Sequence, residues 1–204
     1  MFTGIISDIG TIRSIEQRGD LRIVIGTDYD TATIAMGASI ACSGACLTVV
    51  DRGPGWFAVD MSGESVACTA PGMWEAGKRL NLERAMKIGD EIGGHIVTGH
   101  VDGVGEVIGI CAEGDSHRVT VRVPESIAPF VASKGSITMD GVSLTVNDVR
   151  DTEDGTHFSV NIIPHTWAVT MLGGLATGAA VNLEIDILAR YLARMQSRLS
   201  AHGR

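Results

Sequence analysis

The sequence has little positive charge and no long run of apolar residues. Sixteen lysines and arginines stand against 24 aspartates and glutamates, which gives a formal net charge of −8 at pH 7 over 204 residues. A nucleic-acid-binding surface needs an excess of basic residues, so this balance argues against such a partner and disfavours a strongly anionic substrate. Neither a membrane-spanning stretch nor a basic, apolar leader is present, and we expect a cytoplasmic protein with no membrane partner.

Cysteine is also scarce, with four residues in all. Only Cys42 and Cys46 lie close together, and neither a Cys-x-x-Cys pair nor a histidine cluster accompanies them. His95 and His100 are five residues apart and would point to opposite faces of a strand. These spacings argue against a metal site and favour free thiols in a reducing compartment. Dinucleotide fingerprints, phosphate loops and nucleophile elbows are absent as well.

Glycine, in contrast, is abundant at 26 residues, and one segment occurs twice. Residues 39–51 read SIACSGACLTVVD and residues 136–148 read SITMDGVSLTVND, with seven of the 13 positions identical. Residues 81–83 return as 182–184, in the same order along the chain. A period near 95 residues is too long for a solenoid repeat and suits a small domain copied once. We therefore predict domains at 1–94 and 95–186, followed by a tail at 187–204.

Each copy is predicted to form six short strands, because β-rich stretches alternate with glycine-containing turns. In the first copy the expected strands are 2–12, 21–25, 38–40, 45–50, 56–61 and 79–84. In the second copy they are 97–107, 118–123, 135–138, 142–149, 157–162 and 180–185, with short helices after Pro124 and at 166–172. Since closure removes unpaired sheet edges, this pattern predicts an all-β fold of two tandem six-stranded antiparallel barrels. Residues 88–94 would form the linker.

The tail differs from the rest of the chain. From residue 187 onward, apolar residues recur at helical spacing, at Leu188, Tyr191, Leu192, Met195 and Leu199. Arginines occupy another face. This pattern predicts a helix. It could cap a barrel or pack against copies of itself, and an apolar stripe of about three turns favours the second alternative.

Two equivalent strands carry a pair of small polar residues. Thr48 and Thr145 each lie two positions after another such residue, Cys46 and Ser143, so each pair points to one face of its sheet. Inside a barrel, a threonine hydroxyl would ordinarily bond the backbone. A polar pair in both copies instead favours a surface that faces a ligand.

The two copies differ at several polar positions. At five positions the second copy has a different residue from the first: His100 in place of Ile5, Lys134 in place of Gly37, Ser143 in place of Cys46, His165 in place of Glu64 and Asp186 in place of Ala85. Two similar pockets with different polar residues would hold two related molecules in different roles, such as donor and acceptor. Ordinary drift after duplication is the alternative.

Several motifs together resemble the riboflavin synthases of the α-subunit type, over nearly the whole chain. They are MFTGI at 1–5, CLTV at 46–49, DEIGGH at 90–95, GH at 99–100, SLTV at 143–146 and NLEID at 182–186. The resemblance implies two lumazine-binding Greek-key β-barrels and a C-terminal helix that joins a homotrimer. It also implies active sites between the N-terminal barrel of one subunit and the C-terminal barrel of another.

The implied reaction is a dismutation of two molecules of 6,7-dimethyl-8-ribityllumazine, the last step of riboflavin biosynthesis. One molecule donates a four-carbon unit to the other, which yields riboflavin and 5-amino-6-ribitylamino-uracil. The resemblance implies no cofactor and no metal, in agreement with the missing motifs. A flavin-dependent oxidoreductase barrel would need a nucleotide domain that this chain lacks.

Carried over by position, the resemblance also implies the residues of the site. The expected substrate-binding residues are Gly4, Ile5, Ile6, Cys46, Leu47, Thr48, Asp60, Met61, Ser62, Gly63, Glu64, Ser65, Gly99, His100, Val101, Lys134, Ser143, Leu144, Thr145, Asn161, Ile162, Ile163, Pro164, His165 and Thr166. Seven residues would take part in the chemistry. His100 and Thr145 would move a proton from the C7 methyl group, with Ser143 and Asp186 nearby. The partner substrate would be served by Cys46, Ser39 and Thr48.

A lumazine-binding antenna protein is the rival interpretation, since such proteins share the fold and the duplication but catalyse nothing. They usually keep the polar pocket residues in one half only. This chain keeps Cys46 and Thr48 in the first half and Ser143 and Thr145 in the second, which favours an enzyme.

Overall fold

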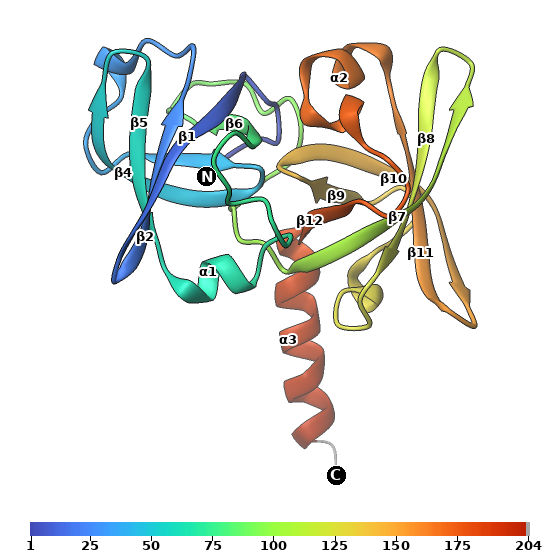
Figure 1. Cartoon of the computed structure of the whole chain (residues 1–204). Coiled ribbons are helices and arrows are strands. Elements are labelled where there is room, and N and C mark those ends of the chain that lie inside the picture. The colour runs from blue at the N-terminus through green and yellow to red at the C-terminus, as the bar shows by residue number, and fades with distance from the viewer. Residues whose placement is uncertain (203–204) are drawn as a thin grey trace.

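Two closed β-barrels and a protruding C-terminal helix make up the chain, of which the computed structural model describes residues 1–202 (Figure 1). The first barrel consists of β1 (Asp8–Arg18), β2 (Asp20–Gly26), β3 (Ser39–Cys42), β4 (Ala45–Gly53), β5 (Trp56–Met61) and β6 (Arg79–Arg84). The second barrel consists of β7 (Gly103–Glu113), β8 (Ser116–Val123), β9 (Ser136–Met139), β10 (Val142–Thr152), β11 (Gly155–Ile162) and β12 (Ala180–Ile185). All neighbouring strands are antiparallel, and the order β1-β2-β5-β4-β3-β6 recurs as β7-β8-β11-β10-β9-β12.

The helical elements are short except for the last. They are η1 (Thr31–Thr33), α1 (Gly63–Ala67), η2 (Ala128–Phe130), α2 (Pro164–Val169), η3 (Met171–Gly174) and α3 (Ile187–His202). In Figure 1, α1 lies at the lower edge of the first barrel and α2 at the upper edge of the second. A two-fold rotation about the viewing direction would exchange these two helix positions. No helix among the described residues combines the length and apolar character needed to cross a membrane.

Each barrel has its own apolar core, built by the alternation of its strands. On β4 the side chains of Leu47 and Val49 point inward and are buried, whereas Thr48 is exposed on the outer face. Phe57 and Phe158, which are equivalent in the repeat, are fully buried in the first and second core respectively. The predicted polar pairs therefore lie on the outer faces of the barrels, because residues two apart share a face.

The prediction of twelve strands and a terminal helix is confirmed, but two strand starts are wrong. The expected strands 2–12 and 97–107 begin only at Asp8 and Gly103. The preceding segments bend at Gly4 and Gly99, both with φ +78°, and their amide groups bond carboxylates instead of a sheet neighbour. The helix expected at 166–172 is divided into α2 and η3 at Thr170, which is extended.

These two bent segments cross over, so that each completes the opposite barrel. Phe2 and Val97, which are equivalent in the repeat, form a bridge with N···O distances of 2.8 and 3.1 Å. Beyond it, Ile6 packs against the core of the second barrel and Val101 against the core of the first. An approximate two-fold axis therefore relates the two halves.

Two hairpin turns meet near this axis. Ser43-Gly44 joins β3 to β4 and Asp140-Gly141 joins β9 to β10, each with two positive φ angles, as a type I′ turn requires. The turns touch so closely that a Cβ on Gly141 would lie 2.8 Å from the amide nitrogen of Gly44. Glycine is therefore needed at these positions for the approach as well as for the backbone angle.

Two buried asparagines join the barrels beside these turns. The Asn81 side chain donates to the Asp140 carbonyl oxygen (2.9 Å) and accepts from the Met171 amide (2.7 Å). Its counterpart Asn182 donates to the Ser43 carbonyl oxygen (2.8 Å) and accepts from the Ala70 amide (2.7 Å). Because buried polar groups are costly when unpaired, these reciprocal bonds define one relative orientation of the barrels.

The contact between the turns predicts a stability difference between two glycine substitutions. We expect Gly141→Ala to lower the free energy of unfolding by about 2–4 kcal/mol, because a left-handed backbone angle and a steric clash add together. Gly19→Ala in the β1–β2 hairpin also has a positive φ but meets nothing within 4 Å, so it should cost only about 1 kcal/mol. Chemical denaturation of both variants measures the difference, and equal losses would contradict the role of the contact.

The carboxyl group of Asp140 predicts a pH dependence of stability. Burial raises the pKa of Asp140 to about 7, although the Asn182 amide bonds the carboxylate (2.8 Å). Because this pKa lies above the unfolded value of about 4, the contribution of Asp140 is full below pH 4 and is lost as the pH rises through 7. Asp140→Asn should therefore gain stability relative to wild type between pH 5 and pH 8. Asp115→Asn, in an exposed turn, is the control and should show no such change.

Candidate functional site

A cleft of about 190 Å³ opens on the outer face of the first barrel beside α1. Three parts of the chain line it: the start of β4, the α1 region, and the crossing segment from the second half of the sequence. Its residues are Ala45, Cys46, Leu47, Glu64, Ser65, Cys68, Thr69, Gly99, His100 and Val101. Seven of these ten were predicted to bind substrate, and the structure brings them together from positions more than 50 residues apart.

The carboxylate of Glu184 positions the crossing segment in this cleft. It accepts hydrogen bonds from the Thr98 amide and hydroxyl (both 2.7 Å), the Gly99 amide (2.9 Å) and the His100 amide (3.1 Å). Burial raises the pKa of Glu184, against the effect of these donors. The Gly99 carbonyl then accepts from the Cys46 amide (2.8 Å), so the segment runs along β4 and leaves the His100 imidazole exposed at the cleft.

Glu83 forms the equivalent arrangement at the second barrel. Its carboxylate accepts from the Thr3 amide and hydroxyl (both 2.7 Å) and the Gly4 amide (2.9 Å), and burial raises its pKa. The Gly4 carbonyl accepts from the Ser143 amide at 2.8 Å. The predicted segments at residues 4–6 and 143–145 are thereby brought together, with Thr145 exposed beside them.

The predicted polar residues divide between the two barrels. On the first barrel, Ser39 and Thr48 are cross-strand partners on the outer face of β3 and β4, the face that also carries Cys46. His100 lines the cleft with Cys46, whereas Ser143 and Thr145 are not among its lining residues. Asp186 follows β12 at the start of α3, where its carboxylate accepts from the Leu188 amide (2.9 Å). Within one chain, therefore, His100 belongs with the first barrel's polar group.

Some predicted binding residues offer no side chain to a ligand. Leu47, Met61, Leu144 and Ile162 point into the barrel cores and are buried, so only their backbone faces outward. By contrast, a group of predicted residues at the starts of α1 and α2 is exposed: Ser62, Gly63, Glu64, Ile163, Pro164 and His165. The Ser62 hydroxyl caps α1 by accepting from the Ser65 amide at 3.2 Å.

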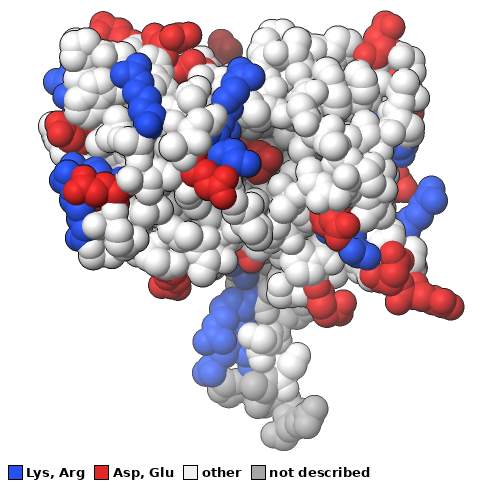
Figure 2. All heavy atoms as spheres, viewed as in Figure 1, with Lys and Arg blue, Asp and Glu red and all other residues white. Residues whose placement is uncertain are grey.

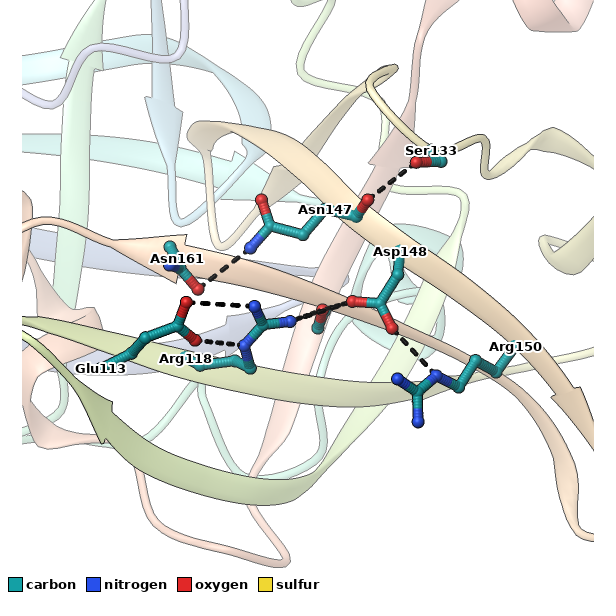
Figure 3. Close-up of polar contacts among 8 residues, drawn as sticks. Glu113, Arg118, Ser133, Asn147, Asp148, Arg150 and Asn161 are labelled. Atoms are coloured by element: carbon teal, nitrogen blue, oxygen red, sulfur yellow. Dashed lines mark hydrogen bonds and ion pairs between the residues drawn. The ribbon is translucent and has the colours of Figure 1, made fainter.

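Asn161 and its counterpart Asp60 are engaged by neighbouring side chains. Figure 3 shows that the Asn161 side-chain oxygen accepts from the Asn147 amide group (3.0 Å), close to the Glu113–Arg118 ion pair. Asp60 binds Arg22 through both carboxylate oxygens (2.5 and 3.1 Å), and this hydrogen bonding lowers the pKa of Asp60.

The Arg118 network holds the neighbouring strands in register. Besides Glu113, the Arg118 guanidinium bonds Asp148 (3.0 Å), which also pairs with Arg150 (3.1 Å), and Ser133 bonds the Asn147 carbonyl (2.7 Å) (Figure 3). The network joins β7, β8, β10 and β11. The charged groups of the network thus neutralise one another.

Lys134 has a strained backbone in the second copy. Its φ is +65°, while its counterpart Gly37 has φ +80°. The Lys134 amide donates to the Val146 carbonyl on β10 and the Gly37 amide to the Val49 carbonyl on β4, both at 2.8 Å. Left-handed angles suit glycine and cost other residues about 1 kcal/mol or more. Lys134 therefore carries a backbone strain that glycine avoids at the equivalent position.

His95, Cys68 and Thr69 lie at these sites but were not among the predicted binding residues. Cys68 and Thr69 line the first cleft just after α1. The His95 ring lies 2.7 Å from the Ser143 hydroxyl. The only sequence signal for His95 was its place in the motif at 90–95, since no repeat partner marked it.

Comparisons with known proteins agree with this architecture. The lumazine binding domain family matches twice, at residues 3–85 and 98–186. The chain is 48% identical over 201 residues to riboflavin synthase of Brucella abortus, covering 96% of this chain and 98% of that one. The chain belongs to the riboflavin synthase family. Riboflavin synthases are transferases, so this member of the family is an enzyme, as the sequence predicts.

Other relatives and solved structures extend the comparison. Riboflavin synthase of Mycobacterium tuberculosis is 43% identical over 197 residues, covering 96% of this chain and 98% of that one. The structure of LumP complexed with riboflavin has a TM-score of 0.78 and 26% identity, and it covers 91% of this chain and 100% of that one. LumP complexed with 6,7-dimethyl-8-(1'-D-ribityl) lumazine has a TM-score of 0.77 at the same identity.

The strained lysine predicts opposite effects of reciprocal substitutions in this riboflavin synthase family member. Lys134→Gly should raise the free energy of unfolding by about 0.5–1 kcal/mol, because it relieves a left-handed lysine. Gly37→Lys should lower it by about 1 kcal/mol, since nothing lies within 4 Å of the added Cβ and only the positive φ is unfavourable for lysine. Urea denaturation checks both. A stability loss in Lys134→Gly would mean that the lysine holds the fold together.

Proposed function

We propose that the chain converts two molecules of 6,7-dimethyl-8-ribityllumazine to riboflavin and 5-amino-6-ribitylamino-uracil. One lumazine donates a four-carbon unit and the other accepts it. The observation that carries this proposal is the pair of equivalent outer-face sites with unlike polar groups, Cys46 with His100 on one barrel and Ser143 with Thr145 on the other. Two like molecules with unlike roles need such a pair. The full-length relatedness to riboflavin synthases supports the same reaction.

Each barrel would bind one lumazine, with units at 1–94 and 95–186. The first would lie in the cleft beside α1, and the second would lie along residues 4–6 and 143–145 near α2. Because α1 and α2 lie at opposite edges of the two-barrel body, two lumazines bound to one chain would not meet (Figure 1). We infer that the reaction takes place between the first barrel of one chain and the second barrel of another, in a homotrimer.

The surface of helix α3 supports the proposal that several chains assemble. Five of its apolar side chains, with 62–72% of their surface exposed, form one stripe: Leu188, Tyr191, Leu192, Met195 and Leu199. Basic side chains gather on another side of α3 in Figure 2, and Arg190 pairs with Asp102 at 2.8 Å. This pair anchors the helix to the second barrel while the apolar stripe stays free for copies of α3. Such a seam resembles a coiled-coil interface.

In the proposed chemistry, Cys46, Ser39 and Thr48 serve one substrate, supplying or accepting a nucleophile at its C7 carbon. Ser143 and Thr145, with Asp186 nearby, face the other substrate and help to remove a proton from its C7 methyl group. His100 would reach that proton from the neighbouring chain. Most of the acceleration would come from holding two heterocycles in a fixed orientation, and acid–base help would add about 100-fold or more. The four free thiols are consistent with a cytoplasmic location.

The reaction is tested by mixing the purified chain with 6,7-dimethyl-8-ribityllumazine alone and following absorbance. We expect one riboflavin for every two lumazines consumed, without any added cofactor or metal. A shifted lumazine spectrum with no riboflavin formed would mean that the chain is a carrier or antenna. Absence of binding would contradict the proposal altogether.

The assembly is tested by charge substitutions on the two sides of α3. Leu192→Glu with Met195→Glu places two carboxylates in the apolar stripe and should give a monomer by light scattering, with riboflavin formation reduced at least about 100-fold because no second chain completes the site. Ala193→Glu with Ser197→Glu adds the same charge away from the stripe and should leave the oligomer intact. A monomer that retains full activity would refute the shared site.

A further inference from the structure

His95 lies directly behind Ser143 and is held there by the backbone. Its Nδ1 is 2.7 Å from the Ser143 hydroxyl oxygen, and its Nε2 is 3.4 Å from the hydroxyl oxygen of buried Thr138. The His95 amide donates to the Thr3 carbonyl at 3.2 Å. At the preceding residue, Gly94, a Cβ would lie 2.0 Å from that carbonyl oxygen and 2.9 Å from the Ser143 hydroxyl. Only glycine therefore lets the chain bring His95 this close.

The surroundings of His95 are polar at the positions where the first copy is apolar. In the first copy, Ala41, Cys46 and Ala85 form a small cluster with Phe2 and Val97. The strand pairings align these three positions with polar residues of the second copy, which are Thr138, Ser143 and Asp186. Thr138 and Ser143 lie within hydrogen-bond distance of the His95 ring, and the charge of Asp186 acts on it, so the three changes concern one histidine.

The bonding around the ring fits a neutral imidazole that accepts a proton at Nδ1. With hydrogen on Nε2, the ring can donate toward Thr138 and accept the Ser143 hydroxyl proton at Nδ1. Burial lowers the pKa of His95, while the negative charge of Asp186 acts in the opposite direction. Burial thus favours the neutral, proton-accepting form of the ring. The Asp186 carboxylate would stabilise the imidazolium that forms when the ring takes a proton.

We propose that His95 is a positioning residue that acts through Ser143, by accepting the hydroxyl proton of Ser143 while the Ser143 oxygen removes a proton from the substrate. The C–H bond of the C7 methyl group breaks and its proton bonds to the Ser143 oxygen. The original hydroxyl proton moves to His95 Nδ1, so the substrate carries the negative charge and the imidazole the positive charge. Asp186 stabilises that imidazolium. The inference rests on the proposed function of the second-barrel site.

Four variants test the relay in the full-length protein: His95→Asn, His95→Ala, Ser143→Ala and Ser143→Ala with His95→Ala. Asparagine can accept the hydrogen bond but cannot take a proton. Both His95 variants should lower kcat about 100-fold, as expected for loss of general-base assistance, with riboflavin affinity unchanged within about twofold. They should also slow the enzyme-dependent exchange of C7-methyl hydrogens with deuterium oxide. His157→Asn, at a histidine on β11 outside the proposed relay, is the matched control.

The double variant separates a relay from two independent effects. Groups that act as a unit give non-additive losses, so Ser143→Ala with His95→Ala should be no slower than Ser143→Ala alone. Full activity of His95→Asn, multiplicative losses in the double variant, or weakened riboflavin binding would each overturn the proposal. If the wild-type chain forms no riboflavin, the proposed function has failed. If the wild-type chain forms riboflavin and His95→Asn forms it at the same rate, only the relay has failed.

Discussion

Two buried carboxylates hold the crossing segments on which the rest of the structure depends. Glu83 accepts three hydrogen bonds from the segment that crosses from the first half of the chain to the second barrel. Glu184 accepts four from the segment that crosses from the second half to the first barrel. Burying a carboxylate is costly unless donors surround it, and the bent backbone at Gly4 and Gly99 supplies those donors. The arrangement bends each segment out of the sheet and places it at the candidate site on the opposite barrel.

Much of the fold followed from local patterns. The repeat and the alternating strands predict two six-stranded barrels and a terminal helix, and the structure confirms them. The early strand starts were wrong because alternation shows which residues are extended but not which partner their amides bond. At Gly4, that partner is a carboxylate 79 residues away, and no pattern in the sequence marks the pairing.

The sequence predicts individual residues of the candidate site better than it predicts which of them lie together. Comparison of the copies singled out Cys46, Ser143 and His100, and the cleft brings Cys46 and His100 together. The exchange of segments between barrels, which places His100 on the first barrel, comes from tertiary structure alone. His95 was missed for a related reason, since its significance lies in a 2.7 Å contact with a residue 48 positions away. Neither spacing nor composition reports such contacts.

The bridge between Phe2 and Val97 bears on how this chain arose. Equivalent residues pair with each other there, which is what two identical molecules related by a two-fold axis would do. We infer that a single-barrel ancestor existed as a pair that exchanged these segments, with both ligand sites alike by symmetry. Two copies carried on one chain, in contrast, need not be identical. Changes such as Ala85 to Asp186 could then be selected in one site without harming the other.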